Sequence, residues 1–259
     1  MATQSLANDA ASDIFAELDA HAIALLLDVD GTLIDIGPTP RDVHVADDLR
    51  ASLNALSRAT DGALALVSGR PIADLDVLFA PLKLPAVGGH GAELRLRSGV
   101  AVRAAAPLSP DLRRHLAGAA TPGSGIIVED KGYSLALHYR QAPQHEERVR
   151  SYIAAGRAAY PGEATEVLPG KAMLEVKRME VNKGDGVREL MRLPPFAGRK
   201  PVFIGDDVTD ASVFALLKDW GGLGFSVGRH FFSGLAGMFN SPLDVRRALQ
   251  RLAAKARAS

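Results

Sequence analysis

The stretch of sequence that decides the fold is Ala24-Leu25-Leu26-Leu27-Asp28-Val29-Asp30-Gly31-Thr32-Leu33. An apolar strand carries two aspartates, one residue apart, into a glycine turn. Because open parallel sheets bind ligands at the carboxyl ends of their strands, we expect both carboxylates to converge on one point there. Paired aspartates suit a hard cation, and they also suit a division of labour between a nucleophile and an acid. The structural alternative is a buried strand followed by an ordinary polar turn.

Composition is typical of a soluble globular protein. The chain has 259 residues, 47% hydrophobic and 23% charged, which is enough for one large or two modest domains. Its 30 basic and 30 acidic residues give a formal net charge of zero, so no overall basic field favours nucleic acid or an anionic membrane. The absence of cysteine excludes disulfides, thiolate metal sites and cysteine nucleophiles.

The N-terminal sequence indicates no targeting segment. It lacks a basic n-region, and the apolar run Ala22–Leu27 is too short for a signal core or a membrane span. We therefore expect a cytoplasmic protein that binds neither membrane nor nucleic acid. We expect a monomer, although the sequence does not exclude an oligomer.

Alternating strand and helix patterns organise both ends of the chain, an order typical of a parallel α/β sheet. Besides the opening strand, we predict strands over Ala63–Ser68, Ala86–Gly88, Pro201–Ile204 and Gly224–Val227. We predict helices over Asp47–Ala59, Ile72–Phe79, Gly184–Met191, Ala211–Leu217 and Asp244–Ala256.

The middle of the chain has a different pattern. After a Pro/Ala linker at Ala104–Pro110, apolar and polar residues alternate on both sides of a tight turn, which predicts an antiparallel hairpin. The elements expected here are strands over Ile126–Glu129, Ser134–Tyr139, Glu166–Leu168 and Met173–Val176 and a helix over Gln144–Tyr160. The prediction is a Rossmann-like α/β core with a parallel sheet, residues 1–105 and 181–259, and a smaller inserted α+β domain, residues 106–180.

The opening strand supplies two candidate reacting groups. Asp28 is the candidate nucleophile, since a carboxylate can attack phosphorus and form an aspartyl-phosphate. Asp30 is the candidate general acid and base, protonating the leaving alkoxide and then deprotonating water. We expect the Thr32 hydroxyl to hold Asp30 by a hydrogen bond.

Further candidate phosphate-binding groups follow later elements. Ser68 ends the second strand and can donate to a phosphoryl oxygen. Arg70 can bind a phosphate through two parallel hydrogen bonds, or can act structurally. Lys183 opens a helix, where a cation opposes the helix dipole, and this cost is accounted for if the side chain reaches inward to the nucleophile.

The second strong signal is Gly205-Asp206-Asp207-Val208-Thr209-Asp210. Repulsion among close carboxylates is costly unless a cation relieves it. Asp206 is therefore the candidate direct metal ligand, with Asp207 and Asp210 as supporting or alternative ligands. A helix N-cap cluster is the structural alternative.

Together these segments resemble the four motifs of the haloacid dehalogenase superfamily of phosphotransferases. The resemblance implies a Mg²⁺ ion held by Asp28, the backbone carbonyl of Asp30, and Asp206. The position of the insert, between the Ser68 and Lys183 elements, implies the larger cap class, and its hairpins fit the α/β subtype. A cap of this kind selects the substrate.

Together with Gly89-His90-Gly91-Ala92-Glu93 and Gly205–Asp210, the insert makes most of the chain, roughly residues 22–228, resemble the trehalose-6-phosphate phosphatases. The resemblance implies that cap acids and a lysine, here Glu129, Lys131 and Glu175, bind sugar hydroxyls. We also expect His90 and Arg140 to contact substrate, although a plain loop histidine and a surface arginine are the structural alternatives. The implied substrate is trehalose 6-phosphate, and the implied cofactor is Mg²⁺.

Two positions depart from the family pattern: Ala211 stands where the family has Glu, and Lys177 stands where it has Arg. These departures leave open a related sugar phosphate, such as mannosyl-3-phosphoglycerate or sucrose phosphate. A phosphomutase and a non-catalytic sugar-phosphate sensor are further alternatives, but a sensor would need neither a nucleophile nor a separate acid.

Overall fold

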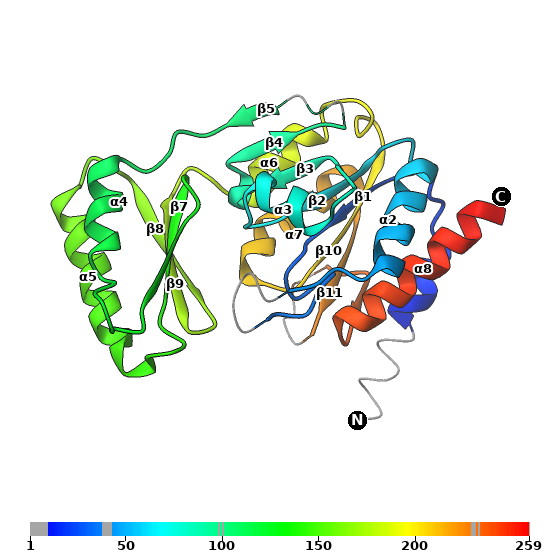
Figure 1. Cartoon of the computed structure of the whole chain (residues 1–259). Coiled ribbons are helices and arrows are strands. Elements are labelled where there is room, and N and C mark those ends of the chain that lie inside the picture. The colour runs from blue at the N-terminus through cyan, green and yellow to red at the C-terminus, as the bar shows by residue number, and fades with distance from the viewer. Residues whose placement is uncertain are drawn as a thin grey trace. The chain divides into compact units, whose positions relative to one another are not determined.

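The computed structural model describes residues 10–37, 43–97, 99, 101–228, 232 and 234–258. Contacts divide the chain into two compact units. The larger unit comprises Met1–Ala104 and Asn182–Ser259, and the smaller unit comprises Ala105–Val181. Each unit is built around its own sheet (Figure 1).

The sheet of the larger unit has eight strands among the described residues, in the order β12-β11-β10-β1-β2-β3-β4-β5. Strands β12 through β3 run parallel to one another, whereas β4 and β5 are antiparallel at one edge. The strands are β1 (Ile23–Leu27), β2 (Leu64–Val67), β3 (Ala86–Gly88), β4 (Glu93–Arg95), β5 (Ala101–Ala104), β10 (Lys200–Gly205), β11 (Leu223–Val227) and β12 (Gly237–Phe239).

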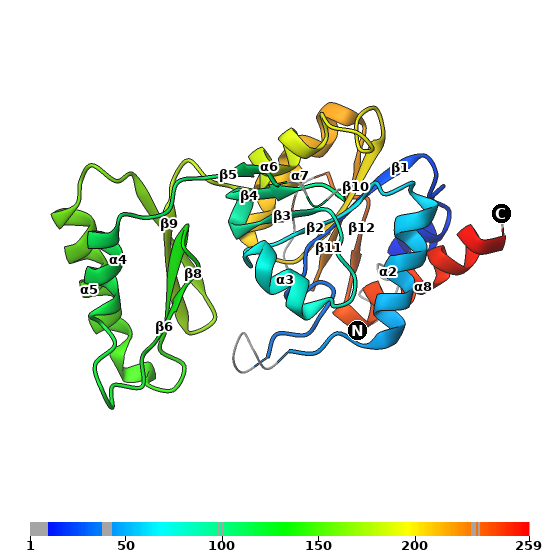
Figure 2. The ribbon, with the colours of Figure 1, turned by 45° about the horizontal axis from the view of Figure 1, so that its top comes forward.

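Strand β1 is apolar throughout because both of its faces are covered. Ile23, Leu25 and Leu27 pack into one core, and Ala24 and Leu26 pack into the other. The first core is shared with helices α2 (Asp47–Ala59), α3 (Ile72–Leu78) and α8 (Pro242–Ala258), and the second with α6 (Lys183–Leu190) and α7 (Ala211–Leu217). Helices α2 and α8 lie side by side in both views (Figures 1 and 2). The predicted Rossmann-like α/β class is thus confirmed.

The smaller unit has a four-stranded antiparallel sheet among its described residues, in the order β6-β7-β9-β8. Its helices α4 and α5 lie together on one face of this sheet (Figure 2). The elements are α4 (Pro110–Ala117), β6 (Ile127–Asp130), β7 (Ser134–His138), α5 (Glu146–Ala159), β8 (Thr165–Gly170) and β9 (Met173–Arg178).

Alternation along these strands separates apolar from polar side chains. Leu135, Leu137, Leu174 and Val176 pack with α4 and α5 in the core of the smaller unit. On the opposite face, the strand register sets polar residues in rows. One row aligns Glu129 with Ala136 and Glu175, and the next aligns Ser134 with Lys177 and Glu166.

Several short elements differ from the sequence predictions. Strands β4, β5 and β12 have only three or four residues each, too few for a periodic pattern. Helix α4 begins at Pro110, inside the expected linker, because Ser109 caps it by accepting a hydrogen bond from the Leu112 N–H at 3.3 Å. The sequence signal for α4 was therefore present.

A left-handed turn follows β3. Gly89, His90 and Gly91 have φ angles of 55°, 56° and 102°. A Cβ on Gly91 would lie 2.0 Å from the carbonyl oxygen of Asn182, so only glycine fits there. This close approach fixes the point at which the chain re-enters the larger unit.

No helix in the described part of the chain is both long and apolar enough to cross a bilayer.

Candidate active site

Asp28 directly follows β1 and is almost fully buried, with 3% of its surface exposed. Its backbone N–H donates to the carbonyl oxygen of Ile204 in the neighbouring strand β10 at 2.9 Å, which extends the parallel ladder by one residue. Its carboxylate oxygen Oδ1 accepts from the Lys183 ammonium at 2.7 Å. The sheet thus presents a buried carboxylate next to a buried cation.

Lys183 is the first residue of α6, and several contacts fix its backbone. The Asn182 side chain caps the helix by accepting from the Asp185 N–H at 2.9 Å. The Gly184 N–H donates to the Ser212 hydroxyl of α7 at 3.1 Å, and a Cβ on Gly184 would lie 2.6 Å from the Ser212 carbonyl oxygen. The start of α6 is therefore held tightly against α7.

Asp210 joins Lys183 to the turn after β10. Its Oδ1 accepts from the Lys183 ammonium at 2.7 Å, while its Oδ2 accepts from the backbone N–H groups of Asp206 and Asp207 at 3.0 Å each. Both oxygens of this fully buried carboxylate are thus engaged. Asp210 acts as the counter-ion of Lys183 and as the organiser of the acidic turn.

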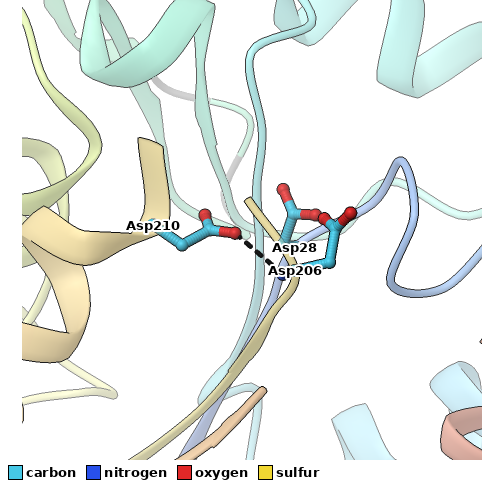
Figure 3. A group of neighbouring side chains, drawn as sticks. All are labelled: Asp28, Asp206 and Asp210. Atoms are coloured by element: carbon cyan, nitrogen blue, oxygen red, sulfur yellow. Dashed lines mark hydrogen bonds between the residues drawn. The ribbon is translucent and has the colours of Figure 1, made fainter. Parts of the chain in front are cut away.

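Asp206 places its carboxyl group beside that of Asp28, as Figure 3 shows. Thr32 donates to its Oδ1 at 3.4 Å, and a Cβ on Gly31 would lie 2.1 Å from its Oδ2. Glycine at position 31 therefore makes room for a carboxylate from a distant segment. The prediction that Thr32 holds Asp30 is wrong, because its hydroxyl donates to Asp206.

The cluster carries more negative than positive charge. Oxygens of Asp28, Asp206 and Asp210 all lie within 4.8 Å of one another, an arrangement that could hold a metal ion. Burial raises the pKa of Asp28 well above its usual value, and the charges of Asp210 and Asp206 add to this although Lys183 opposes it. Burial and Asp210 likewise raise the pKa of Asp206 to about 6.

Lys183 remains a cation in this environment. Burial acts to lower the pKa of its ammonium, but the charges of Asp210 and Asp28 and the hydrogen bonds to both raise the pKa overall. One ammonium faces three carboxylates, so the cluster retains an excess of acid that a divalent cation would relieve.

A second group of predicted residues lies on the loops around β1 and β2. Arg70 donates from Nε and Nη2 to the two carboxylate oxygens of Asp30, at 2.7 and 2.6 Å. Ser68 is buried and accepts from the Arg70 backbone N–H at 3.1 Å. His90 donates from its backbone to the Ser68 carbonyl at 3.0 Å, and its ring packs against Gly69.

The smaller unit brings together its own polar residues on the face opposite the helices. Glu175 accepts from the Ser134 hydroxyl at 2.5 Å and from the Lys131 ammonium at 3.0 Å. Glu129 pairs with His138 at 2.9 Å. Burial acts to raise the pKa of Glu129, but the hydrogen bond from His138 and the charge of Lys131 lower the pKa overall.

Two predicted residues lie apart from these groups. Arg140 is exposed just beyond the end of β7 and donates to the Lys171 carbonyl oxygen at 3.2 Å. Asp207 is exposed and accepts from the Val208 N–H at 2.6 Å, so it caps the short turn before α7.

Comparison with known proteins decides the family. The family model described as "Trehalose-phosphatase" matches residues 26–234. A probable trehalose-phosphate phosphatase from Sinorhizobium fredii is 40% identical over 227 residues, covering 86% of this chain and 84% of the relative. The trehalose-6-phosphate phosphatase of Escherichia coli is 40% identical over 207 residues, covering 79% of this chain and 77% of its own length.

This chain belongs to the trehalose-phosphatase family.

The fold agrees with that assignment. The solved C-terminal domain of Candida albicans trehalose-6-phosphate phosphatase superposes with a TM-score of 0.78 at 22% sequence identity, covering 94% of this chain and 96% of that one. The resemblance of this chain to the trehalose-phosphatase family, based on motifs, is confirmed.

For this member of the trehalose-phosphatase family, the sequence analysis missed two residues, Ser134 in the smaller unit and Ser212 in the larger unit. Ser134 and His138 each bind a predicted cap carboxylate, and Ser212 anchors the start of α6. No motif signal marks Ser134, because its contact with Glu175 depends on strand register. From the sequence, His138 is expected to combine packing in the inserted domain with substrate contact, and the structure pairs it with Glu129 across the hairpin.

Proposed function

We propose that this chain is a Mg²⁺-dependent phosphomonoester hydrolase that converts trehalose 6-phosphate into trehalose and inorganic phosphate. Family membership and the name of the Escherichia coli relative support the substrate. The observation that carries the chemistry is the buried Asp28 carboxylate, held 2.7 Å from Lys183 and beside Asp206. A buried nucleophile, a fixed cation and surplus acid together suit phosphoryl transfer.

The acidic cluster fits a Mg²⁺ ion. Carboxylate and carbonyl oxygens are the ligands that this ion takes, and the three carboxylates of the cluster lie beside one ammonium, that of Lys183. We assign Asp28, the backbone carbonyl of Asp30, and Asp206 as the ligands. Asp210 is assigned to Lys183, because both of its oxygens already accept hydrogen bonds. A bound Mg²⁺ would neutralise phosphoryl oxygens, so that an anionic nucleophile can approach.

In the first step, an oxygen of Asp28 attacks the phosphorus of the substrate, and the bond from phosphorus to the sugar oxygen breaks. Asp30 gives a proton to the departing sugar oxygen, which leaves as a hydroxyl. Lys183 and the Ser68 hydroxyl balance charge on the phosphoryl oxygens. The product of this step is an aspartyl-phosphate on Asp28.

In the second step, Asp30 takes a proton from water, and the water oxygen attacks phosphorus. The bond between phosphorus and Asp28 breaks, which releases inorganic phosphate and restores the carboxylate. Lys183 then again pairs with Asp28, as it does in the structure.

Sugar recognition is assigned to the polar face of the smaller unit. Glu129, Lys131 and Glu175 offer acceptors and donors to sugar hydroxyls, and their neighbours hold them in fixed orientations. His90 of the larger unit and Arg140 of the smaller unit are assigned further contacts with the substrate.

The test is phosphate release from a panel of sugar phosphates, measured with Mg²⁺ and with EDTA. We expect release from trehalose 6-phosphate to be well above release from glucose 6-phosphate, and EDTA to abolish it. Equal rates across the panel would overturn the substrate, and an isomerised sugar phosphate without free phosphate would indicate a mutase. Full activity of Asp28→Asn would overturn the mechanism.

A further inference from the structure

The ion pair between Asp30 and Arg70 has a geometry that the proposed mechanism leaves unused. Two N–H groups on one edge of the guanidinium, Nε and Nη2, meet the two carboxylate oxygens at 2.7 and 2.6 Å. This parallel arrangement fixes both the distance and the plane of the carboxylate, which a point charge such as an ammonium cannot do. Arg70 therefore sets the orientation of the candidate acid and base.

The arginine is the rigid partner of this pair. The Arg70 N–H donates to the Ser68 hydroxyl at 3.1 Å, and its carbonyl accepts from the Gly89 N–H at 2.8 Å. Two residues on, Glu93 accepts from the Ile72 N–H at 2.5 Å and so fixes the start of α3. The loop that carries Arg70 is thus bound on both sides.

Asp30 is the more exposed partner, and its orientation depends on the ion pair. The Asp30 side chain is 35% exposed, against 14% for Arg70, and it stands in a turn beside Gly31. Without a fixed partner it would sample several solvent-facing rotamers. Asp28, by contrast, is held inside the cluster by Lys183. The two reacting carboxylates are therefore oriented by different cations from different elements.

We propose that Arg70 is a positioning residue for the acid–base step, and that it acts by holding the Asp30 carboxylate in place rather than by binding the phosphoryl group of the substrate. The proposal rests on the proposed function, in which Asp30 donates a proton to the leaving sugar oxygen and later accepts one from water.

The first experiment compares steady-state kinetics on trehalose 6-phosphate for Arg70→Met and Arg70→Lys. We expect Arg70→Met to lower kcat by about 100-fold with KM nearly unchanged, as for a reacting group displaced by about 1 Å. Arg70→Lys should recover only part of the loss, since an ammonium cannot make the two parallel bonds. A raised KM with an intact kcat would overturn the proposal and show that Arg70 binds the phosphoryl group.

A matched control exists on the neighbouring elements. Arg95 makes the same kind of two-bond pair with Asp76, at 2.6 and 2.7 Å, with side-chain exposures of 12% and 24%. Arg95→Met should leave kcat within about twofold, because loss of an equivalent pair away from the reacting groups costs only stability. An equal fall in kcat for Arg95→Met and Arg70→Met would overturn the proposal in favour of a general structural effect.

A second readout separates the two chemical steps. The leaving group of p-nitrophenyl phosphate departs without a proton, so mispositioned Asp30 should slow only the attack of water on the aspartyl-phosphate. In Arg70→Met we expect a burst of about one p-nitrophenolate per active site, followed by slow turnover. Slow turnover without a burst would overturn the proposal.

Combination with Asp30→Asn tests whether Arg70 acts through Asp30. If it does, Arg70→Met in the Asp30→Asn background should cause little further loss of kcat, a strong departure from additivity. A full further loss would overturn the proposal. The same set distinguishes the two failures: full activity of Asp30→Asn removes the acid–base step of the proposed function, whereas a strongly lowered but measurable kcat of Asp30→Asn beside an unaffected Arg70→Met removes only this inference.

Discussion

Both units place carboxylates beside a lysine, but the pKa values of these carboxyl groups shift in opposite directions. In the larger unit, Asp28, Asp206 and Asp210 share the single ammonium of Lys183, and the pKa values of Asp28 and Asp206 are raised. In the smaller unit, Lys131 pairs with Glu175, and the pKa of Glu129 is lowered. In the larger unit, three carboxylates therefore form an acidic cluster beside one ammonium. In the smaller unit, hydrogen bonds join Glu175 to Lys131 and Ser134, and Glu129 to His138. We call this second group the compensated network.

This difference in pKa shifts indicates which kind of ligand each site suits. The acidic cluster is short of positive charge, which suits a divalent cation and a phosphoryl group that arrive together. In the network each carboxylate already has a hydrogen-bonded partner, which suits the binding of uncharged sugar hydroxyls. A substitution or condition that acts on one of the two sites alone therefore tests this contrast.

Removal of the ammonium should break the cluster. In Lys183→Met, three carboxylates lose their buried counter-charge, so we expect the free energy of unfolding to fall by about 3–5 kcal/mol. Phosphate release should fall by about 10²–10³-fold, because a donor to the phosphoryl oxygens is lost. Chemical denaturation and a phosphate assay measure both. Lys200→Met, at the exposed first position of β10, is the control and should change neither.

Addition of Mg²⁺ should complete the cluster and leave the network unaffected. An ion at 100 times its dissociation constant stabilises the folded state by about 2.7 kcal/mol. Thermal unfolding of the wild type should shift upward with Mg²⁺, and the shift should be lost in Asp206→Asn but kept in Glu175→Gln. An undiminished shift in Asp206→Asn would place the ion elsewhere.

The two sites should respond to pH with opposite signs in metal-free buffer. A carboxyl group with a raised pKa stabilises the fold at low pH, and this stabilisation is lost as pH rises. Relative to Asp206→Asn, the wild type should therefore lose about 2 kcal/mol as pH rises from about 4 through the Asp206 pKa of about 6.

The lowered pKa of Glu129 has the reverse effect. Its contribution is present above the usual glutamate pKa of 4.5 and is lost as pH falls below it. Relative to Glu129→Gln, the wild type should therefore lose stability towards acid. Denaturant titrations across this range measure both differences, and slopes of the same sign for the two variants would contradict the contrast.

The smallest predicted effect concerns the compensated network. Ser134→Ala removes one hydrogen bond to the Glu175 carboxylate, worth about 1.5 kcal/mol for a charged acceptor. We expect a roughly tenfold rise in KM for trehalose 6-phosphate with kcat unchanged. Ser151→Ala, exposed on α5, is the matched control. A fall in kcat without a change in KM would show that Ser134 serves the chemistry rather than binding.

The parallel core was predictable from the sequence, because a strand that is buried on both faces is apolar throughout, as β1 is. The convergence of Asp28 and Asp206 was likewise predictable from strand ends that meet at one edge, and that of Lys183 from the cost of a cation at a helix start. The partner of Thr32 was not, because the sequence does not show that Asp206 packs directly on Gly31. The contacts of Asp210 were not predictable either, because the sequence does not show that the backbone N–H groups of Asp206 and Asp207 donate to its carboxylate.

The polar network of the smaller unit was only partly predictable. Sequence alternation indicated one polar face, but the contact between Ser134 and Glu175 follows from the register of β7 against β9, which periodicity does not fix. Helix α4 was missed although Ser109 and Pro110 form a recognisable helix start. Strands as short as β4, with three residues, gave no periodic pattern.

The close approach of Gly91 to the Asn182 carbonyl has a consequence for evolution and for engineering. Because the larger unit itself anchors the residue just before Lys183, the intervening segment can be exchanged without disturbing the position of that lysine. We therefore expect that segments with other recognition chemistries can be transplanted between Ala104 and Asn182 while the residues around Asp28 keep their positions.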